Sequence, residues 1–135
     1  MRSKRLLKVN IFTNDNDIDH ARSVRALKFS QNNQTLISSG EDTHINLTDV
    51  ETLKRKLTVT GHADWVTSLT ISNHAKVFVS GALDSQIKVW DLNSGKCVKT
   101  MGMKAPVWGV AFSPNGEHLV AATQDGTISL IALQL

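Results

Sequence analysis

A histidine, a serine and an aspartate lie close together in the middle of the chain, as His62, Ser80 and Asp84. These residue types can form a catalytic triad, in which the histidine takes a proton from the serine hydroxyl and the aspartate orients the histidine. The chain has no G-x-S-x-G sequence, the turn that exposes the nucleophilic serine of many hydrolases. The residue types therefore permit hydrolytic chemistry, and whether it occurs depends on how the surrounding elements position the three side chains.

The sequence offers no metal or cofactor site. Three alternating aspartates at residues 15–19 have the start of a calcium loop, but His20 replaces the required glycine and Ala26 replaces the closing glutamate. The five histidines and the single cysteine, Cys97, lack zinc-binding spacing. No glycine-rich loop suited to phosphate is present. We therefore predict no cofactor and no bound metal.

The chain repeats itself with a period of about 40 residues. Residues 20–30, 62–72 and 103–113 each place three apolar side chains at the same spacing and end on a serine. A second apolar run follows in each copy, then an aspartate, then a third run. The closing aspartates lie 42 and then 41 residues apart and are Asp42, Asp84 and Asp125. This period is typical of a four-stranded blade of a β-propeller.

Two polar segments join the copies, residues 54–60 and 96–102, and each has the composition of an exposed strand. No stretch has the 3.6-residue apolar spacing of an amphipathic helix over several turns. The pattern therefore predicts an all-β fold, in which each copy forms three strands and the joining segment adds an outer one.

The middle copy carries the marks of a known family. They are Gly61-His62 at its start, Asp84 at its second turn and Trp90-Asp91 at the end of its third strand. The chain resembles the WD-repeat family, whose members fold as β-propellers, and the resemblance covers nearly all of it. It implies three four-stranded antiparallel blades that form a partial ring, not closed on its own.

The expected organisation follows from these copies. A basic N-terminal end, residues 1–19, contains a predicted outer strand at 6–12 and a polar loop. The WD repeats follow at residues 20–61, 62–102 and 103–135, and the last lacks its outer strand. In the family an N-terminal strand supplies the missing one, and Leu6 to Phe12 is the candidate here.

The resemblance changes the interpretation of the histidine, serine and aspartate. In WD-repeat proteins the positions of His62, Ser80, Asp84 and Trp90 form a structural hydrogen-bonded tetrad, so we predict no catalysis. A buried indole N–H or imidazole left without a partner would cost roughly 1–3 kcal/mol. The other copies retain part of the set, as His20, Ser38 and Asp42 in the first and Asp125 alone in the third.

Family members bind peptides mainly on the face where the inner strands begin. The residues expected there are the strand entrances, the residues before the turn aspartates and one tryptophan further in: Ser23, Trp65 and Pro106; Glu41, Leu83 and Gln124; and Trp108. Because this set is uncharged apart from Glu41, we predict that it binds short apolar segments of protein subunits, with Trp65 as anchor. Trp65 packing against the next blade, and Trp108 packing in the core or channel, are the alternatives.

Several stretches resemble the superkiller-complex WD-repeat subunits within the family: residues 62–71, 78–91 with 95–100 after them, and 106–113. This resemblance implies a non-enzymatic scaffold of a multiprotein complex, either cytoplasmic and linked to messenger RNA decay or nuclear and linked to transcription elongation. A generic adaptor of another complex and a self-associating propeller fragment without independent function are the alternatives.

Charge and composition limit the classes of partner and the cellular location that we expect. The formal net charge is +3, but residues 1–8 carry four positive charges and no acid, which leaves the remainder at −1. A solvated terminus explains this basic end, and RNA binding through it is the alternative. Direct nucleic-acid binding by the folded body is not expected. With one cysteine and no apolar run long enough for a membrane span, we expect an intracellular protein of the cytoplasm or nucleus.

Three blades are fewer than the four to eight of a typical closed propeller. An open arc leaves an apolar blade face bare at each end, which is unfavourable in a monomer. We therefore expect one of two arrangements. Either the chain is the C-terminal part of a larger ring, or two chains of three blades associate through their open faces.

Overall fold

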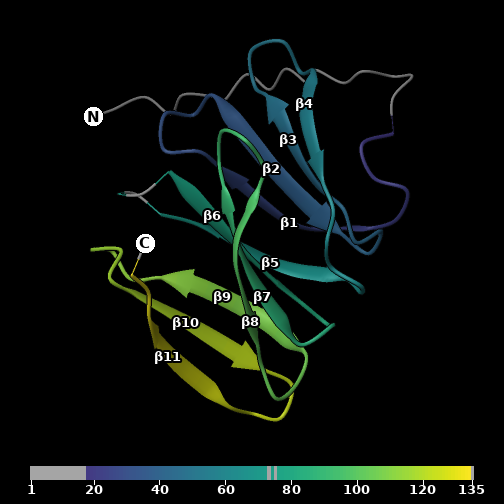
Figure 1. Ribbon diagram of the computed structural model, residues 1–135. Coiled ribbons are helices and arrows are strands. Elements are labelled where there is room, and N and C mark those ends of the chain that lie inside the picture. The colour runs from purple at the N-terminus through teal and green to yellow at the C-terminus, as the bar shows by residue number, and fades with distance from the viewer. Residues whose placement is uncertain (1–17, 73, 75, 135) are drawn as a thin grey trace, which may run out of the picture.

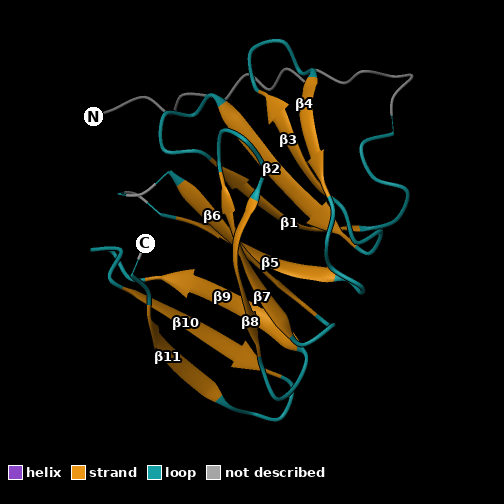
Figure 2. Ribbon diagram, in the orientation of Figure 1, coloured by secondary structure: helices purple, strands orange, loops and turns teal. Residues whose placement is uncertain are grey.

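The computed structural model describes residues 18–72, 74 and 76–134. These residues form eleven strands and no helix (Figure 2). The strands make three antiparallel sheets, the blades, which follow one another from the top to the bottom of the view in Figure 1. The prediction of an all-β fold built from propeller blades that do not close is confirmed. The predicted strand at 6–12 and the basic residues 1–8 lie outside the described residues.

In every blade the strands pair in the order in which they occur along the chain. Blade 1 contains β1 (Val24–Phe29), β2 (Thr35–Gly40), β3 (Ile45–Asp49) and β4 (Arg55–Val59). Blade 2 contains β5 (Val66–Ile71), β6 (Val77–Ala82), β7 (Gln86–Asp91) and β8 (Cys97–Gly102). Blade 3 contains β9 (Val107–Phe112), β10 (His118–Thr123) and β11 (Ile128–Ala132). Within the described part of the chain, β11 has no strand on its outer side.

The aspartate of the Trp-Asp pair ends the third strand by capping the turn that follows. The Asp91 carboxylate accepts hydrogen bonds from the backbone N–H groups of Asn93, at 2.9 Å, and Ser94, at 2.8 Å. The bond from Ser94 lowers the pKa of Asp91. Gly95 then adopts a φ of 72°, which favours glycine. Asp49 caps the equivalent turn of blade 1 in the same way.

Two hydrophobic clusters hold the blades together, one between blades 1 and 2 and the other between blades 2 and 3. Successive side chains of a strand point to opposite faces of a sheet. For this reason β6 supplies Phe78 to the first cluster and Val79 to the second, and both are fully buried. The middle blade is therefore apolar on both faces.

Each inner strand carries a β-bulge near its start. In β1 the partners of Val24 and Ala26 are adjacent residues of β2, so that Arg25 is an extra residue. The same shift leaves Thr67 extra in β5 and Trp108 extra in β9. A bulge bends the strand locally and redirects a side chain. The three bulges mark the same end of every blade, where the inner strands begin.

Candidate functional site

Blade 2 brings His62, Ser80, Asp84 and Trp90 into one network. His62 Nδ1 lies 2.9 Å from Asp84 Oδ2, and His62 Nε2 lies 2.7 Å from Ser80 Oγ. The indole N–H of Trp90 donates to the same Ser80 oxygen at 2.8 Å. If Nδ1–H donates to the carboxylate and the serine hydroxyl donates to Nε2, every group has a partner.

These distances match those of a catalytic triad, but the serine is buried away from solvent. A nucleophilic serine must reach a substrate carbonyl, and Ser80 is 0% exposed. The Trp90 indole donates to its hydroxyl oxygen, and the ring of Phe78 is stacked 6.2 Å from that of Trp90. The network instead ties the chain before β5 to strands β6 and β7.

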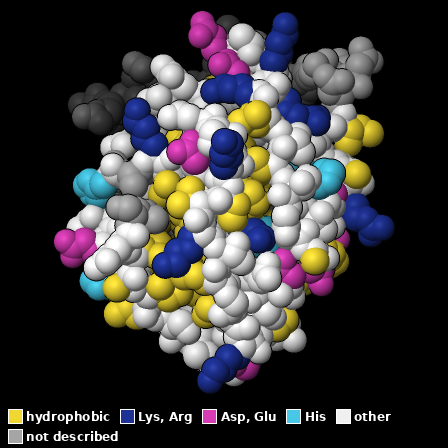
Figure 3. All heavy atoms as spheres, viewed as in Figure 1, with side chains coloured by type: hydrophobic (Ala, Val, Ile, Leu, Met, Phe, Trp, Pro, Cys, Tyr) yellow, Lys and Arg dark blue, Asp and Glu magenta, His cyan; other side chains and the backbone are white. Residues whose placement is uncertain are grey.

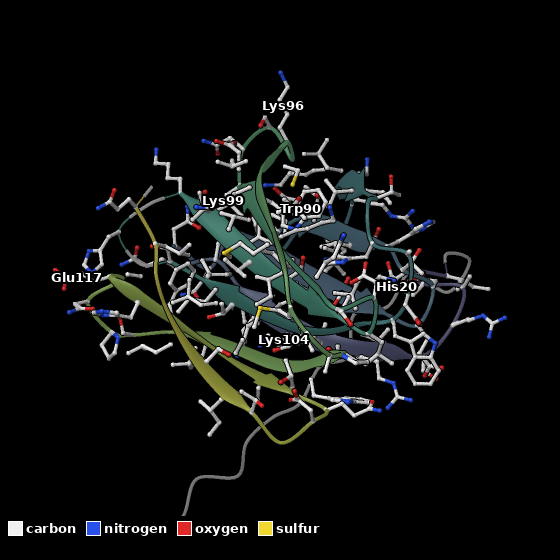
Figure 4. All side chains as sticks on the ribbon, turned by 60° about the horizontal axis from the view of Figure 1, so that its bottom comes forward. His20, Trp90, Lys96, Lys99, Lys104 and Glu117 are labelled. Carbon is white, nitrogen blue, oxygen red and sulfur yellow. The ribbon has the colours of Figure 1, made fainter. Side chains whose placement is uncertain are left out.

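Blade 1 repeats the histidine network without the indole. His20 Nδ1 lies 2.9 Å from Asp42 Oδ2, and His20 Nε2 lies 2.8 Å from Ser38 Oγ. Thr48 occupies the position of the tryptophan. Figure 4 labels His20 and Trp90, which belong to the networks of neighbouring blades.

Asn46 adds a polar link to blade 1 that the sequence pattern did not reveal. Its buried side chain donates to the carbonyl of Asp19 and accepts from the Thr58 hydroxyl at 2.9 Å. It thereby joins the chain before β1 to strands β3 and β4. The matching residue of blade 2 is Lys88, which bonds to Thr100 instead. Asparagine is uncommon in strands, and its place between the apolar residues Ile45 and Leu47 was the available signal.

Blade 3 has lost the histidine network. Asp125 keeps a local role, accepting from the Thr123 hydroxyl at 2.6 Å and from the backbone N–H of Thr127 at 3.2 Å. The bond from Thr123 is the largest cause of the lowered pKa of Asp125. Met103 and Ile131, at the positions of the histidine and tryptophan, pack against the second hydrophobic cluster.

The pKa values of His62 in blade 2 and of Asp42 in blade 1 are both shifted by their surroundings. Burial lowers the pKa of His62, because a protonated ring would lose its hydration, although the hydrogen bond to Asp84 opposes this. For Asp42, burial alone would raise the pKa. The backbone N–H of His44 and the side chain of His20 more than offset that effect, so the pKa of Asp42 is lowered.

We expect the free energy of unfolding to fall as the pH drops below 6.5. In the unfolded chain His62 has its ordinary pKa of 6.5, whereas in the folded protein its pKa is lower. Between these two values the unfolded chain binds more protons, so stability rises with pH there and is fully present above 6.5. Urea unfolding at pH 7 and pH 5 measures the difference. His62→Gln should show a weaker pH dependence, and an undiminished one would contradict this assignment.

The predicted partner-binding residues meet in pairs at the end of the blades where the bulges lie. One backbone hydrogen bond closes each strand entrance, with a length of 2.9–3.0 Å. The donors are the N–H groups of Glu41, Leu83 and Gln124, and the acceptors are the carbonyls of Ser23, Trp65 and Pro106, respectively. Trp65, Leu83 and Pro106 are partly buried, whereas Ser23 and Gln124 are exposed.

Trp65 contacts Arg25, a residue that the sequence-based set omits. The guanidinium carbon of Arg25 lies 4.8 Å from the centre of the Trp65 ring. Arg25 also pairs with Glu41, with a nitrogen–oxygen distance of 2.8 Å. The ring therefore contacts blade 1 laterally and keeps part of its surface exposed. Sequence reasoning missed Arg25 because only the bulge in β1 directs it toward the neighbouring blade.

Trp108 lies at the third bulge and is half-exposed. Its indole N–H donates to the side-chain oxygen of Gln124 at 3.3 Å. The structure thus brings two of the predicted residues of blade 3 into direct contact and leaves the Trp108 ring accessible to a partner.

The described residues hold no group of three or more His, Cys, Asp or Glu side chains that could bind a metal ion. Cys97 is exposed and forms no disulfide. No helix long and apolar enough to cross a membrane occurs in the part of the chain that the structure describes.

The repeats, the three blades and the histidine networks define the class of protein. The family model of the WD domain, G-beta repeat, matches residues 13–49, 53–91 and 95–131. The chain therefore belongs to the WD-repeat family. The second and third matches each begin with an outer strand, β4 or β8, and continue into the next blade. Each of these repeats thus links two consecutive blades covalently.

Among curated proteins, the chain is similar to eukaryotic translation initiation factor 3 subunit I. It is 31% identical to the protein from Debaryomyces hansenii and 32% identical to that from Meyerozyma guilliermondii, over 82% of this chain and 33% of each relative. Identity to the Botryotinia fuckeliana protein is 26%, over 86% of this chain and 36% of the relative. The chain spans about a third of the length of these relatives.

These relatives do not support the predicted resemblance to the superkiller-complex subunits. They are named as subunits of a translation initiation factor, so roles in messenger RNA decay and transcription elongation are not supported either. The residues behind that prediction, including Asp84 and Trp90, maintain the blade itself through the tetrad. Such residues identify the repeat rather than one complex.

Proposed function

We propose that this protein is a non-enzymatic scaffold that binds a segment of a partner protein across the blade entrances, within a complex of the translation initiation factor 3 type. The accessible part of Trp65, at the junction of blades 1 and 2, carries this proposal. Tryptophan and arginine are frequent binding hot spots because they bury a large area and retain polar groups. The names of the relatives support membership of a translation initiation factor, and hence a cytoplasmic location.

The contacts around Trp65 define the chemistry of the partner segment. Leu83 directly follows β6, donates its backbone N–H to the carbonyl of Trp65 and is partly buried, so it offers a second apolar side chain at the same strand entrance. The Arg25 side chain is 43% exposed, so its guanidinium retains N–H groups for a partner. A short segment with an apolar side chain for Trp65 and Leu83 and a carbonyl or carboxylate for Arg25 would satisfy all three.

We expect Trp65→Ala combined with Leu83→Ala to weaken partner binding by more than about 100-fold, because each buried anchor is worth roughly 2 kcal/mol at an interface. The probe is purified translation initiation factor 3 assembled without its subunit I. Binding of the chain to this complex is measured by co-migration in size-exclusion chromatography and by titration.

Val98→Ala is the matched control, because Val98 is an exposed apolar residue of the outer strand β8 in the same blade. It should bind as the wild-type chain does. Thermal unfolding of all variants should remain cooperative at similar temperatures. Undiminished binding by the double variant would move the site elsewhere, and unfolding of that variant would show that Trp65 is a core residue.

A further inference from the structure

The blade 1 end of the arc exposes an apolar face that is buried elsewhere in the same molecule. In β5, Leu69 packs against blade 1 and is 1% exposed. Leu27 has the same repeat position in β1, which no blade precedes within the described residues, and is 58% exposed. Val24 and Phe29 flank Leu27 on this strand and are also exposed. The face is thus built like one that packs against a preceding blade.

The blade 3 end of the arc also exposes an apolar face, and this face corresponds to the side of a blade that packs against the next blade. In blade 2, Val89 packs against blade 3 and is 0% exposed. Leu130 has the same repeat position in β11 and is 69% exposed. Val120 and Ile128 lie at the positions of two more buried residues of blade 2 and are likewise exposed. This face is built like one that packs against a following blade.

The two open faces are therefore the two halves of one blade interface. At the internal junctions, Leu47 of blade 1 shares a cluster with Leu69, and Val89 of blade 2 shares one with Val110. Leu130 and Leu27 hold the corresponding positions on the two open faces. In Figure 1 these faces belong to the bottom and top sheets, at opposite ends of the arc.

The second strand of each blade carries a small residue where the inner strand of the following blade approaches it. The Ser39 hydroxyl lies 3.5 Å from the carbonyl of Val66. At Gly81, an added Cβ would come within 2.6 Å of a Val107 methyl group. Ala122 holds the same repeat position in blade 3 and is exposed. Ala122 is smaller than Ser39, which the first junction accommodates beside Val66, so its side chain leaves room for an inner-strand valine.

We propose that two copies of this chain associate head-to-tail, with blade 3 of each against blade 1 of the other, to close a six-bladed ring. Six blades lie within the range of closed propellers, and head-to-tail contacts close into rings when the rotation allows it. A stable homodimer buries about 800 Å² on each partner, and here each copy contributes two apolar faces.

The exposed hydrophobic side chains in Figure 3 lie among separated lysine and arginine side chains, so the surface in this view is not uniformly charged. This assembly does not depend on the function proposed above.

Light scattering coupled to size-exclusion chromatography tests the assembly with the 135-residue chain at micromolar concentration. The expected mass is twice the chain mass of 14.8 kDa. Leu27→Lys and Leu130→Glu, made separately, should each shift the protein to the monomer mass, because each places an unpaired charge in both junctions. An equimolar mixture of the two variants should recover the dimer mass, since one junction is then wild-type and the other pairs Lys with Glu.

The mixture distinguishes head-to-tail pairing from symmetric pairing of like faces. If blade 3 paired with blade 3, Leu27→Lys would remain dimeric, and that result would overturn the proposal. Val98→Lys, on the outer strand, is the control and should stay dimeric. Circular dichroism and thermal unfolding establish that all variants fold. A monomeric wild-type chain, an open series of larger oligomers, or folded variants that do not recover the dimer on mixing would each overturn it.

Discussion

Phe78→Ala is expected to lower the free energy of unfolding by about 3–5 kcal/mol, because it removes a large buried side chain and leaves a cavity. Phe78 is fully buried between blades 1 and 2, and its ring is stacked on that of Trp90 with an interplanar angle of 14°. This loss is a large part of the 5–15 kcal/mol that stabilises a typical domain. Urea unfolding followed by tryptophan fluorescence and circular dichroism measures it.

Phe78→Leu is the conservative control, because it keeps most of the volume and should cost less than about 1.5 kcal/mol. Val98→Ala, on the exposed outer strand, should change stability by less than about 0.5 kcal/mol. If Phe78→Ala proved as mild as Val98→Ala, blades 1 and 2 would not form the packed interface described above.

Asp84→Ala is expected to cost about 3 kcal/mol, because the carboxylate holds three groups at once. It accepts from His62 Nδ1 at 2.9 Å, from the backbone N–H of Ala63 at 2.9 Å and from that of Gln86 at 3.0 Å. Its removal leaves the buried His62 without a partner on one side. Thermal and urea unfolding measure the effect.

Asp125→Ala is the matched control for this prediction. Asp125 has the same repeat position and accepts from the backbone N–H two residues further on, as Asp84 does, but has no histidine partner. Both substitutions remove a turn contact of this type. Asp84→Ala also removes the bonds from His62 and from the Ala63 N–H, whereas Asp125→Ala removes only the bond from the Thr123 hydroxyl, so a larger loss for Asp84→Ala reports the contacts made to His62 and Ala63. Equal losses would mean that the aspartate stabilises only its turn and that the network contributes nothing.

The strands and their turns could be predicted because they depend on local patterns, whereas the histidine networks were predicted from the resemblance to the WD-repeat family. Alternation of apolar side chains, the serine at the end of each inner strand and the aspartates at the turns recur along the chain, and each has a local physical cause. Asp91, for example, caps its turn through residues only two and three positions away. Features of this kind need no knowledge of how the blades pack.

The candidate site was predicted in part. The paired residues at the strand entrances follow from the strand ends, and the backbone hydrogen bond between Trp65 and Leu83 forms where the repeat pattern placed it. Arg25 was missed because a strand without a bulge gives no reason for it to approach Trp65. Asn46 was missed because its partners come from the chain before β1 and from β4, and no other blade repeats the contact.

The sequence by itself determined the repeat and the order of the strands, because both depend on short-range spacing, and its resemblance to the WD-repeat family indicated the residues of the histidine network. It also indicated that a three-bladed arc exposes apolar faces. Only the tertiary structure decided that Ser80 is sealed beneath Trp90, that Arg25 stacks on Trp65, and that Leu27 and Leu130 are the exposed counterparts of buried residues. Accessibility and contacts between blades depend on how sheets distant in the chain pack together, and no local pattern contains that information.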